Sequence, residues 1–339
     1  MLKNLSRQFL VLLCTAIFGY TAFAADKNSY ILATASTGGT FYPVGVAIST
    51  LAKVKLEPSK YYGKMTLSAI TSGGSGANIK LLRDKEAQFA ILQGLYGRWA
   101  ATGTGKLKSV GKQSYLRSVS MLWQNVEHMV IDSEYVKTGT VADLKELYGE
   151  KFGIGKKNSG TRGSGEEILT NIGIDTSKYT YVHKGYGGTS SAMQNREIAG
   201  MNIPAGPPVS AITSVYAKLG DKITILDFTD AQLKKVNKDG ELWTRFVISA
   251  KTYPGQEKDI NTIAQPNFLA THENILEEDV YQLTKTLYEN LSFLNAIHSA
   301  TKAMSIDKAI VGLPVPLHPG ALRYYKEQGI NVPKHLIAK

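Results

Sequence analysis

Cysteine is almost absent from this 339-residue chain: the single one, Cys14, lies inside an apolar run near the N-terminus. A lipoprotein signal needs a small residue just before its cysteine, and Leu12 and Leu13 stand there instead. That order argues against lipidation. The remaining chain cannot form disulfides, so a core of apolar side chains must hold the fold together. About 315 residues are enough for such a core, divided between two lobes.

Several patterns with a defined chemistry are also missing. The glycine-rich stretches have neither the G-x-G-x-x-G nor the G-x-x-x-x-G-K-[ST] spacing of nucleotide-binding loops, and no G-x-S-x-G elbow occurs. The six histidines show no H-x-H or H-x-x-x-H pairing, which gives a zinc site little support. Basic residues are dispersed among acids, which argues against nucleic acid as a partner. A Ser/His/Asp triad assembled from distant residues stays open.

The N-terminus does contain a targeting pattern. Residues 1–24 have Lys3 and Arg7, an apolar run over 9–18, and a small-x-small ending at Ala24. This order predicts a cleaved secretory signal peptide over 1–24 and therefore a periplasmic protein. The apolar run is shorter than the roughly 20 residues of a membrane span, so an uncleaved anchor is the weaker alternative.

The charge of the chain is strongly positive. Removing Lys3 and Arg7 with the signal peptide takes no acid away and lowers the formal charge from +11 to +9. Such an excess favours an anionic solute or surface as the partner. An ordinary basic exterior in contact with water is the alternative.

Short apolar strands alternate with helical segments along most of the chain. Strands are expected at 30–35, 65–70, 88–93, 117–123, 128–132, 151–155, 179–183 and 199–204, each followed by a turn or a helix. This alternation predicts an α/β fold with parallel sheets. The C-terminal third differs, with one apolar strand over 262–271 and helices over 277–289 and 291–303.

Two lobes account for this change of character. The chain is expected to cross between them near 123–127 and to return near 262–268. Lobe 1 then contains residues 25–124 plus 266–339, and lobe 2 contains residues 125–265. A ligand in such a fold is expected where strands end and helices begin, in the cleft between the lobes.

Three glycine turns precede helical segments: "TASTGGTFYP" at 34–43, "TSGGSGANIK" at 71–80 and "KKNSGTRGSG" at 156–165. The first N–H groups of a helix lack partners and carry partial positive charge, and glycine lets an anion approach them closely. Three turns of one design favour a shared anion site that includes Gln93, with Tyr42 and Tyr186 as contacts. Ordinary turns capped by Ser or Thr are the alternative. Arg162 adds a possible bidentate grip on a carboxylate, or is a surface arginine.

Taken together, these segments resemble one family. The stretches "ATASTGGTFYPVGVAIS", "TSGGSGANIKLLRDKEAQFAILQGLYGRWA" and "GLPVPLHPGALRYYKEQGI" are similar to the solute-binding proteins of TAXI-type TRAP transporters (tripartite ATP-independent periplasmic transporters). The order and spacing of these motifs match from about Tyr30 to Ile330.

The resemblance implies a fold and a function. It implies a two-lobed periplasmic-binding-protein fold of the type II kind, which closes on a small organic acid and delivers it to a membrane permease driven by a sodium gradient. Glutamate, related dicarboxylates and 2-oxo acids are family ligands. No catalytic residue, cofactor or metal is expected, and one cleft per chain is consistent with a monomer. Mapped onto this chain, the ligand-facing residues are Gly38, Gly39, Thr40, Phe41, Tyr42, Ser72, Ser75, Gln93, Ser159, Gly160, Thr161, Ser164 and Pro207, to which the third turn adds Arg162.

The chain departs from the family pattern at three places. Phe41 stands where a tyrosine is common, Ala199 and Gly200 replace an Asp-Ala pair, and Arg162 with Gly163 interrupts the third turn. If the missing aspartate holds a ligand amine in relatives, its absence favours a plain or 2-oxo dicarboxylate over an amino acid.

Two further questions remain for the structure. Ser75 is expected to donate its hydroxyl to a ligand carboxylate while Ser72 and Asn78 shape the loop; the alternative is that Ser75 only caps a helix. Two other classes of protein also stay open: a periplasmic hydrolase that uses a turn serine, and an adhesin or immunogenic surface protein without a solute.

Overall fold

The computed structural model describes residues 28–58 and 65–338. The expected signal peptide over 1–24 lies outside the described residues. Within the described ranges, no helix combines the length and the apolar character needed to span a bilayer.

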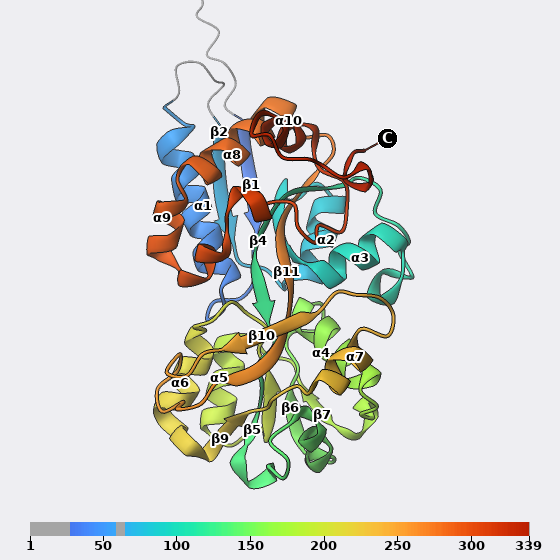
Figure 1. The fold of residues 1–339 in the computed structure, drawn as a ribbon, viewed down its shortest axis with the longest axis vertical. Coiled ribbons are helices and arrows are strands. Elements are labelled where there is room, and N and C mark those ends of the chain that lie inside the picture. The colour runs from blue at the N-terminus through green and yellow to red at the C-terminus, as the bar shows by residue number, and fades with distance from the viewer. Residues whose placement is uncertain (1–27, 59–64, 339) are drawn as a thin grey trace, which may run out of the picture.

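Two β-sheets with flanking helices form two lobes (Figure 1). The first sheet has the strand order β10-β11-β3-β1-β2, and β4 pairs with β11 outside this order, over residues 264–272 of β11. The second sheet has the order β7-β6-β8-β5-β9. The strands are β1 (Asn28–Ala33), β2 (Met65–Ile70), β3 (Phe89–Gln93), β4 (Leu116–Val126), β5 (Met129–Asp132), β6 (Lys151–Gly153), β7 (Thr180–Val182), β8 (Gly200–Asn202), β9 (Ile223–Ile225), β10 (Thr244–Ile248) and β11 (Ile260–His272).

Helices cover the sheets of both lobes (Figure 1). The upper lobe in that view contains α1 (Phe41–Lys55), α2 (Ser75–Arg83), α3 (Gly94–Thr102), α8 (Glu277–Glu289), α9 (Leu291–Ile297) and α10 (Pro319–Glu327). The lower lobe contains α4 (Gly160–Asn171), α5 (Tyr186–Gln194), α6 (Ser210–Leu219) and α7 (Asp230–Val236). Their starts follow known rules: α8 opens with three acids that complement the helix dipole, and Pro319 is the first residue of α10.

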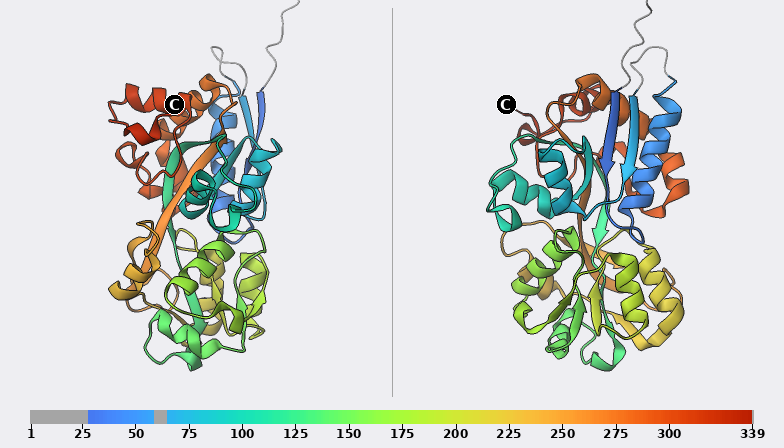
Figure 2. Two further views of the ribbon diagram at one scale, coloured as in Figure 1. Left: turned by 90° about the vertical axis from the view of Figure 1, so that its right-hand side faces the viewer. Right: turned by 180° about the vertical axis from the view of Figure 1, so that it is seen from behind.

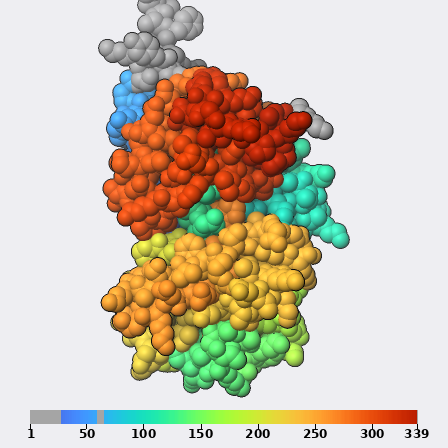
Figure 3. Space-filling view, viewed as in Figure 1, coloured from blue at the N-terminus to red at the C-terminus, as the bar shows by residue number. Residues whose placement is uncertain are grey.

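The strands β4 and β11 run through both lobes and are paired antiparallel along nearly their whole length (Figure 2). In the upper lobe β11 also pairs with β3, and in the lower lobe its first half pairs with β10. The two lobes are separated by a waist, where part of the green segment is visible in the space-filling view (Figure 3). The crossing of the chain is therefore a hydrogen-bonded ribbon of two strands.

The predicted parallel pairing is correct for β1 with β2 and β3, and for β6 with β7 and β8. The strands of the crossing and its neighbours are antiparallel, because the chain returns to the first lobe in the opposite direction. Central strands are buried on both faces, as in the continuous apolar run of β3.

Some local elements differ from the expected pattern. The segment Val141–Leu147 forms a 3-10 helix, and α4 begins at Gly160, inside the third glycine turn. The elements β9, α7, β10 and α10 have no counterpart among the expected ones. The helix α7 lies in the polar stretch that follows Thr229, where a capping box between Thr229 and Gln232 starts it.

A buried histidine lies just beyond the end of β4, in the core of the lower lobe. The ring of His128 is fully buried; its Nδ1 lies 2.9 Å from the Val126 carbonyl, and its Nε2 lies 2.7 Å from the Tyr253 hydroxyl. Nδ1–H therefore donates to a carbonyl and Nε2 accepts from the tyrosine, so the ring is neutral. Burial lowers the pKa of His128 to about 4, although the carbonyls of Val126 and Ile203 act in the opposite direction.

The pKa of His128 generates a stability prediction. Between the ordinary pKa of about 6.5 and the folded value of about 4, the unfolded chain binds a proton that the folded chain does not. His128 should therefore lower the free energy of unfolding as the pH falls through that window, by roughly 3 kcal/mol in full. Denaturant unfolding of the wild type and of His128→Gln, measured from neutral pH down to about pH 5, isolates this contribution.

The wild type and the variant must be compared at each pH because Glu127 changes the free energy of unfolding in the opposite direction to His128. Burial raises the pKa of Glu127 to about 7, so its protonation stabilises the folded state as the pH falls. The variant should lose less stability on acidification than the wild type. Equal losses in both proteins would contradict the assignment to His128.

Candidate functional site

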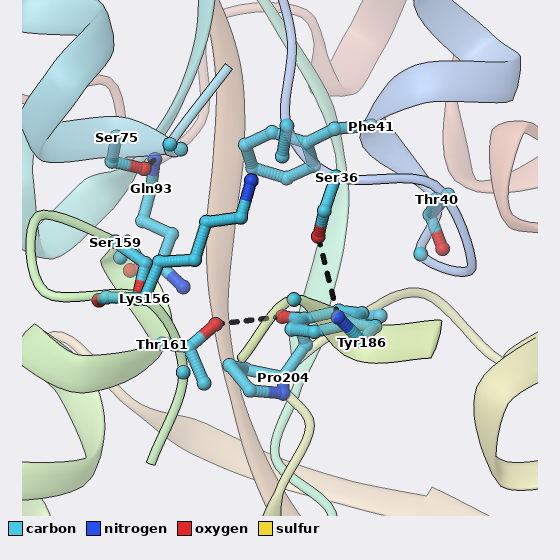
Figure 4. Close-up of a pocket in the computed structure, with 18 of the residues that line it drawn as sticks. Ser36, Thr40, Phe41, Ser75, Gln93, Lys156, Ser159, Thr161, Tyr186 and Pro204 are labelled. Atoms are coloured by element: carbon cyan, nitrogen blue, oxygen red, sulfur yellow. Dashed lines mark hydrogen bonds between the residues drawn. The ribbon is translucent and has the colours of Figure 1, made fainter. Parts of the chain in front are cut away.

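A cavity lies between the two lobes, with a volume of about 480 Å³ that includes the part open to solvent (Figure 4). The lining comes from both lobes. One lobe contributes residues 35, 36, 39–41, 73–75 and 93, and the other contributes residues 155, 156, 159–161, 184–186, 204 and 205.

Four helices begin at this cavity. The first residue of each is a lining residue: Phe41 of α1, Ser75 of α2, Gly160 of α4 and Tyr186 of α5. The first N–H groups of a helix have no partner inside it and carry partial positive charge. In the described part of the chain, no hydrogen bond occupies the N–H of Ser75 or Gly160. The cavity therefore has the electrostatics of an anion site.

Two lysines add to this positive field. Lys156 and Lys184 both line the cavity, and Figure 4 shows the side chain of Lys156 extending across it. Lys156 Nζ lies 3.4 Å from the Ser72 carbonyl of the opposite lobe. Among the described residues that line the cavity, none is Asp or Glu. An anion in the cavity therefore meets cations and N–H dipoles.

The lobes touch directly on either side of the cavity. On one side, the Thr40 hydroxyl donates to the Gly206 carbonyl at 2.9 Å, and Ala211 N–H donates to the Gly38 carbonyl at 3.2 Å. On the other side, Ala77 N–H donates to the Asn158 carbonyl at 3.1 Å. The two lobes are thus in direct contact on both sides of the cavity.

Tyr186 closes the lower edge of the cavity. Its hydroxyl donates to the Pro204 carbonyl at 2.6 Å and lies 2.9 Å from the Thr161 hydroxyl, and its N–H donates to the Ser36 hydroxyl at 3.4 Å (Figure 4). Burial raises the pKa of the Tyr186 phenol well above its ordinary value, and the nearby carboxylate of Glu127 adds to that rise. The phenol is therefore a neutral hydrogen-bonding wall.

Eight of the predicted site residues line the cavity. They come from all three glycine turns and from the end of β3, and they are Gly39, Thr40, Phe41, Ser75, Gln93, Ser159, Gly160 and Thr161. The close approach explains the glycines: a side-chain Cβ at Gly39 would lie 2.7 Å from the Tyr186 ring, and one at Gly160 would lie 2.5 Å from Gln93 Oε1.

Ser75 and Ser159 differ in their local roles. The residue that precedes α2 is Gly74, and no side chain caps that helix, so Ser75 is not its N-cap. The Ser75 hydroxyl oxygen accepts from Gln93 N–H at 3.1 Å, which leaves its O–H free to donate. Ser159 is the N-cap of α4, because its hydroxyl accepts from Arg162 N–H at 3.1 Å.

Six predicted residues lie outside the cavity. Ser72 serves its own loop by accepting from Gly74 N–H at 2.9 Å, and the expectation that it shapes the loop fits this arrangement. Gly38 contacts the opposite lobe through its carbonyl. The remaining four residues away from the lining are Tyr42, Arg162, Ser164 and Pro207.

Arg162 lies away from the lining of the cavity. Its Nε donates to Glu166 at 2.7 Å within α4, and its side chain lines a separate surface pocket with Lys106 and Lys157. Because Glu166 also pairs with Lys106 of the other lobe, the arginine belongs to a contact between the lobes. Although burial acts to raise it, these two cations leave the pKa of Glu166 below its ordinary value.

Several lining residues were not predicted individually. Ser36 and Lys156 belong to two of the quoted glycine turns but were not singled out, whereas Lys184 and Pro204 lie outside all three turns. Tyr186, by contrast, was expected as a contact, because it follows a glycine at the start of a helix, as the residues of the three glycine turns do. In the described part of the chain, no group of three or more His, Cys, Asp or Glu side chains is arranged to hold a metal ion.

Solved structures share this two-lobed fold. MatC from Rhodopseudomonas palustris with bound malate has 13% identity and a TM-score of 0.55, and the match covers 89% of this chain and 98% of that one. The periplasmic binding protein BugD has 13% identity and a TM-score of 0.52, with 89% and 94% of the two chains covered. These matches confirm the predicted fold class.

The sequence itself matches a family model. That model is described as the NMT1-like family, and it matches residues 32–329. The match includes both lobes, the ribbon of β4 and β11, and all four helix starts at the cavity. The chain therefore belongs to the NMT1-like family.

Proposed function

We propose that this protein is a periplasmic solute-binding protein that captures a small organic anion between its lobes. One observation carries the proposal: four helix starts and two lysines surround a cavity whose described lining contains no carboxylate. The fold supports it, since MatC and BugD have the same architecture. The expected signal peptide over 1–24 supports the periplasmic location.

The finer assignment follows from the resemblance to TAXI-type TRAP systems. On that basis the solute is a 2-oxo or plain dicarboxylate, or a glutamate-like acid, and a sodium-coupled membrane permease receives it. The permease contact is transient and the protein acts as a monomer. Nucleic acid is not a partner.

Capture without chemistry fits the lining better than hydrolysis does. A serine nucleophile needs a general base within hydrogen-bond reach. None of the described lining residues is a histidine or a carboxylate, and the hydrogen bond of the Lys156 amine goes to the Ser72 carbonyl and not to a lining serine. The Ser159 hydroxyl is committed to the Lys156 carbonyl at 2.7 Å and to capping α4. We therefore assign no enzymatic activity to the cavity.

Ligand screening tests the proposal directly. Thermal shifts with dicarboxylates, 2-oxo acids and acidic amino acids should identify at least one stabiliser, because the solute binds only the folded state. At a solute concentration 100 times Kd the stabilisation is about 2.7 kcal/mol. Native mass spectrometry of protein taken from the periplasm should show an organic acid, recovered intact after incubation. No shift with any acid at millimolar concentration would contradict capture, and consumption of the acid would indicate an enzyme.

The lysine at the cavity provides a second prediction. Lys156→Gln should weaken binding of the acid by roughly threefold to tenfold, most strongly at low salt, because it removes a cation from the site. Lys157→Gln is the matched control: it removes the same charge one residue further along, and Lys157 does not line the cavity. Isothermal titration of both variants decides the matter. Equal losses of affinity would assign the effect to net charge alone.

Closure of the lobes gives a third prediction. A Cβ at Gly76 would lie 2.7 Å from the Asn158 carbonyl oxygen, which is backbone of the opposite lobe and cannot turn aside. Gly76 does not line the cavity, so Gly76→Ala should hinder closure without touching the solute. Affinity should fall about tenfold or more, since the solute must then bind a more open state.

Small-angle scattering measures the same effect on shape. The wild type should have a smaller radius of gyration with the acid than without it, and Gly76→Ala should show less of this contraction. Gly187→Ala is the control, because a Cβ at that helical glycine meets nothing within 4 Å. Identical curves for the wild type with and without saturating acid would argue against closure.

A further inference from the structure

A layer of buried polar side chains lies on the ribbon of β4 and β11, which passes behind the cavity (Figure 4). Asn125 pairs with Gln265 across the two strands. Glu127 follows Asn125 by two residues in the chain, and Asn267 follows Gln265 by two residues, toward the opposite end of the antiparallel ribbon. Residues two apart on a strand face the same side of the sheet, and so do directly opposed residues. These four side chains therefore share one face, and all four are fully buried.

Most of their polar atoms have no hydrogen-bond partner. In the described part of the chain, fifteen buried side-chain nitrogen or oxygen atoms lack one, and nine of these belong to Asn125, Glu127, Asn202, Gln265 and Asn267. Asn202 comes from β8 and is also fully buried. Each buried unpaired group of this kind costs roughly 1–3 kcal/mol, so such a concentration at one place indicates a binding surface.

The layer adjoins the lining of the cavity. Gln93 lines the cavity and pairs with Asn267 across β3 and β11, and its Oε1 is likewise without a partner. The Trp123 ring, opposite Asn267 on β4, packs edge-on against the lining residue Phe41 at 5.8 Å between ring centroids. Glu127 lies near enough to the lining residue Tyr186 to influence its phenol. The layer therefore lies directly behind the lining of the cavity, and Gln93, Phe41 and Tyr186 separate the two in the described structure.

Glu127 is the only carboxyl group of this layer. Within the described residues no ion pair involves Glu127, and the donors that surround its two oxygens do not reach them with full hydrogen-bond geometry. The polar groups of Asn202, Ser164, Trp243 and Gln265 surround it and favour its charged form, while burial raises its pKa to about 7. A second anion placed against it would be repelled, whereas an O–H or N–H donor would be bound.

We propose that this buried layer is a second subsite for the solute, and that Glu127 is the residue in it that selects an acid carrying a hydroxyl or ammonium group. The inference rests on the proposed function: the helix starts bind the carboxylate, and the layer binds a hydrogen-bond donor further along the same molecule. Neutral amides of Asn125, Asn202 and Asn267 complete the contacts to that group. Glu127 then supplies the acidic partner that Ala199 and Gly200 do not. The ionised form of Glu127 accepts a hydrogen bond from a hydroxyl or ammonium group, so the acids of the proposed function narrow to those that carry one, and the plain and 2-oxo dicarboxylates named there are disfavoured.

Two matched series of acids test this. Within each series only the group on the second carbon changes: succinate, oxaloacetate, malate and aspartate, and glutarate, 2-oxoglutarate, 2-hydroxyglutarate and glutamate. In one series at least, the wild type should bind the hydroxy or the amino compound about tenfold or more tightly than the plain and oxo compounds. If the hydroxy acid binds more tightly, the layer selects a hydroxyl group; if the amino acid binds more tightly, it selects an ammonium group.

The variant Glu127→Gln, which preserves the shape of the side chain, should reduce that preference to about threefold or less while changing the affinity for the plain acid much less. Glu127→Asp keeps the carboxyl group but shortens the side chain by one methylene, so it should show an intermediate preference. This variant replaces Glu127→Gln in the test if the glutamine variant does not fold. Equal weakening of all compounds would make Glu127 only a structural residue. A wild type that prefers the plain or oxo acids, or binds neither series, would overturn the inference. The proposed capture of an organic anion is a separate claim. It would still hold if the predicted preference were absent but other organic acids bound in the screen.

Discussion

The antiparallel ribbon of β4 and β11 is the constraint on which the rest of this structure depends. The two strands are paired from one lobe into the other, so each lobe is built outward from the same hydrogen-bonded ladder. Since β3 pairs with β11 in the first lobe, the helix starts that follow β1, β2 and β3 are held at a fixed place relative to the ribbon. The cavity lies where those starts meet the starts of α4 and α5.

In the proposed function, this arrangement holds one small anion between the two lobes without an arginine in the described lining. Each helix start contributes partial positive charge and unpaired N–H groups, and glycine at the closest approaches admits the opposite lobe. The lobes also bond directly to each other, through Thr40 and Gly206 on one side and Ala77 and Asn158 on the other. A ligand between them adds to contacts that already favour the closed arrangement, so modest binding energy can shift the balance between open and closed states.

Local signals made much of this architecture predictable. The turns around Gly39, Ser75 and Gly160 are determined by neighbours within a few residues, and the sequence therefore predicted both the turns and their position at helix starts. Arg162 lies away from the lining and pairs with Glu166, and the sequence alone does not bring Lys106 of the other lobe to that pair. The helix α7 was overlooked although Thr229 and Gln232 mark its start, because a polar segment without an apolar stripe resembles a loop.

Nothing local indicates the buried face of the ribbon. Asn125 and Gln265 become neighbours only through a pairing between strands far apart in the chain, and Asn202 joins them from a third strand. An apolar ribbon would make a more stable hinge, since unpaired amides and a lone carboxyl group weaken a core. Buried polar groups with few hydrogen-bond partners on the β4–β11 ribbon lower the stability of the folded protein at the position where both lobes adjoin the cavity. Such a sacrifice is typical of a binding surface, where the cost of burying polar groups is offset when the solute supplies their partners.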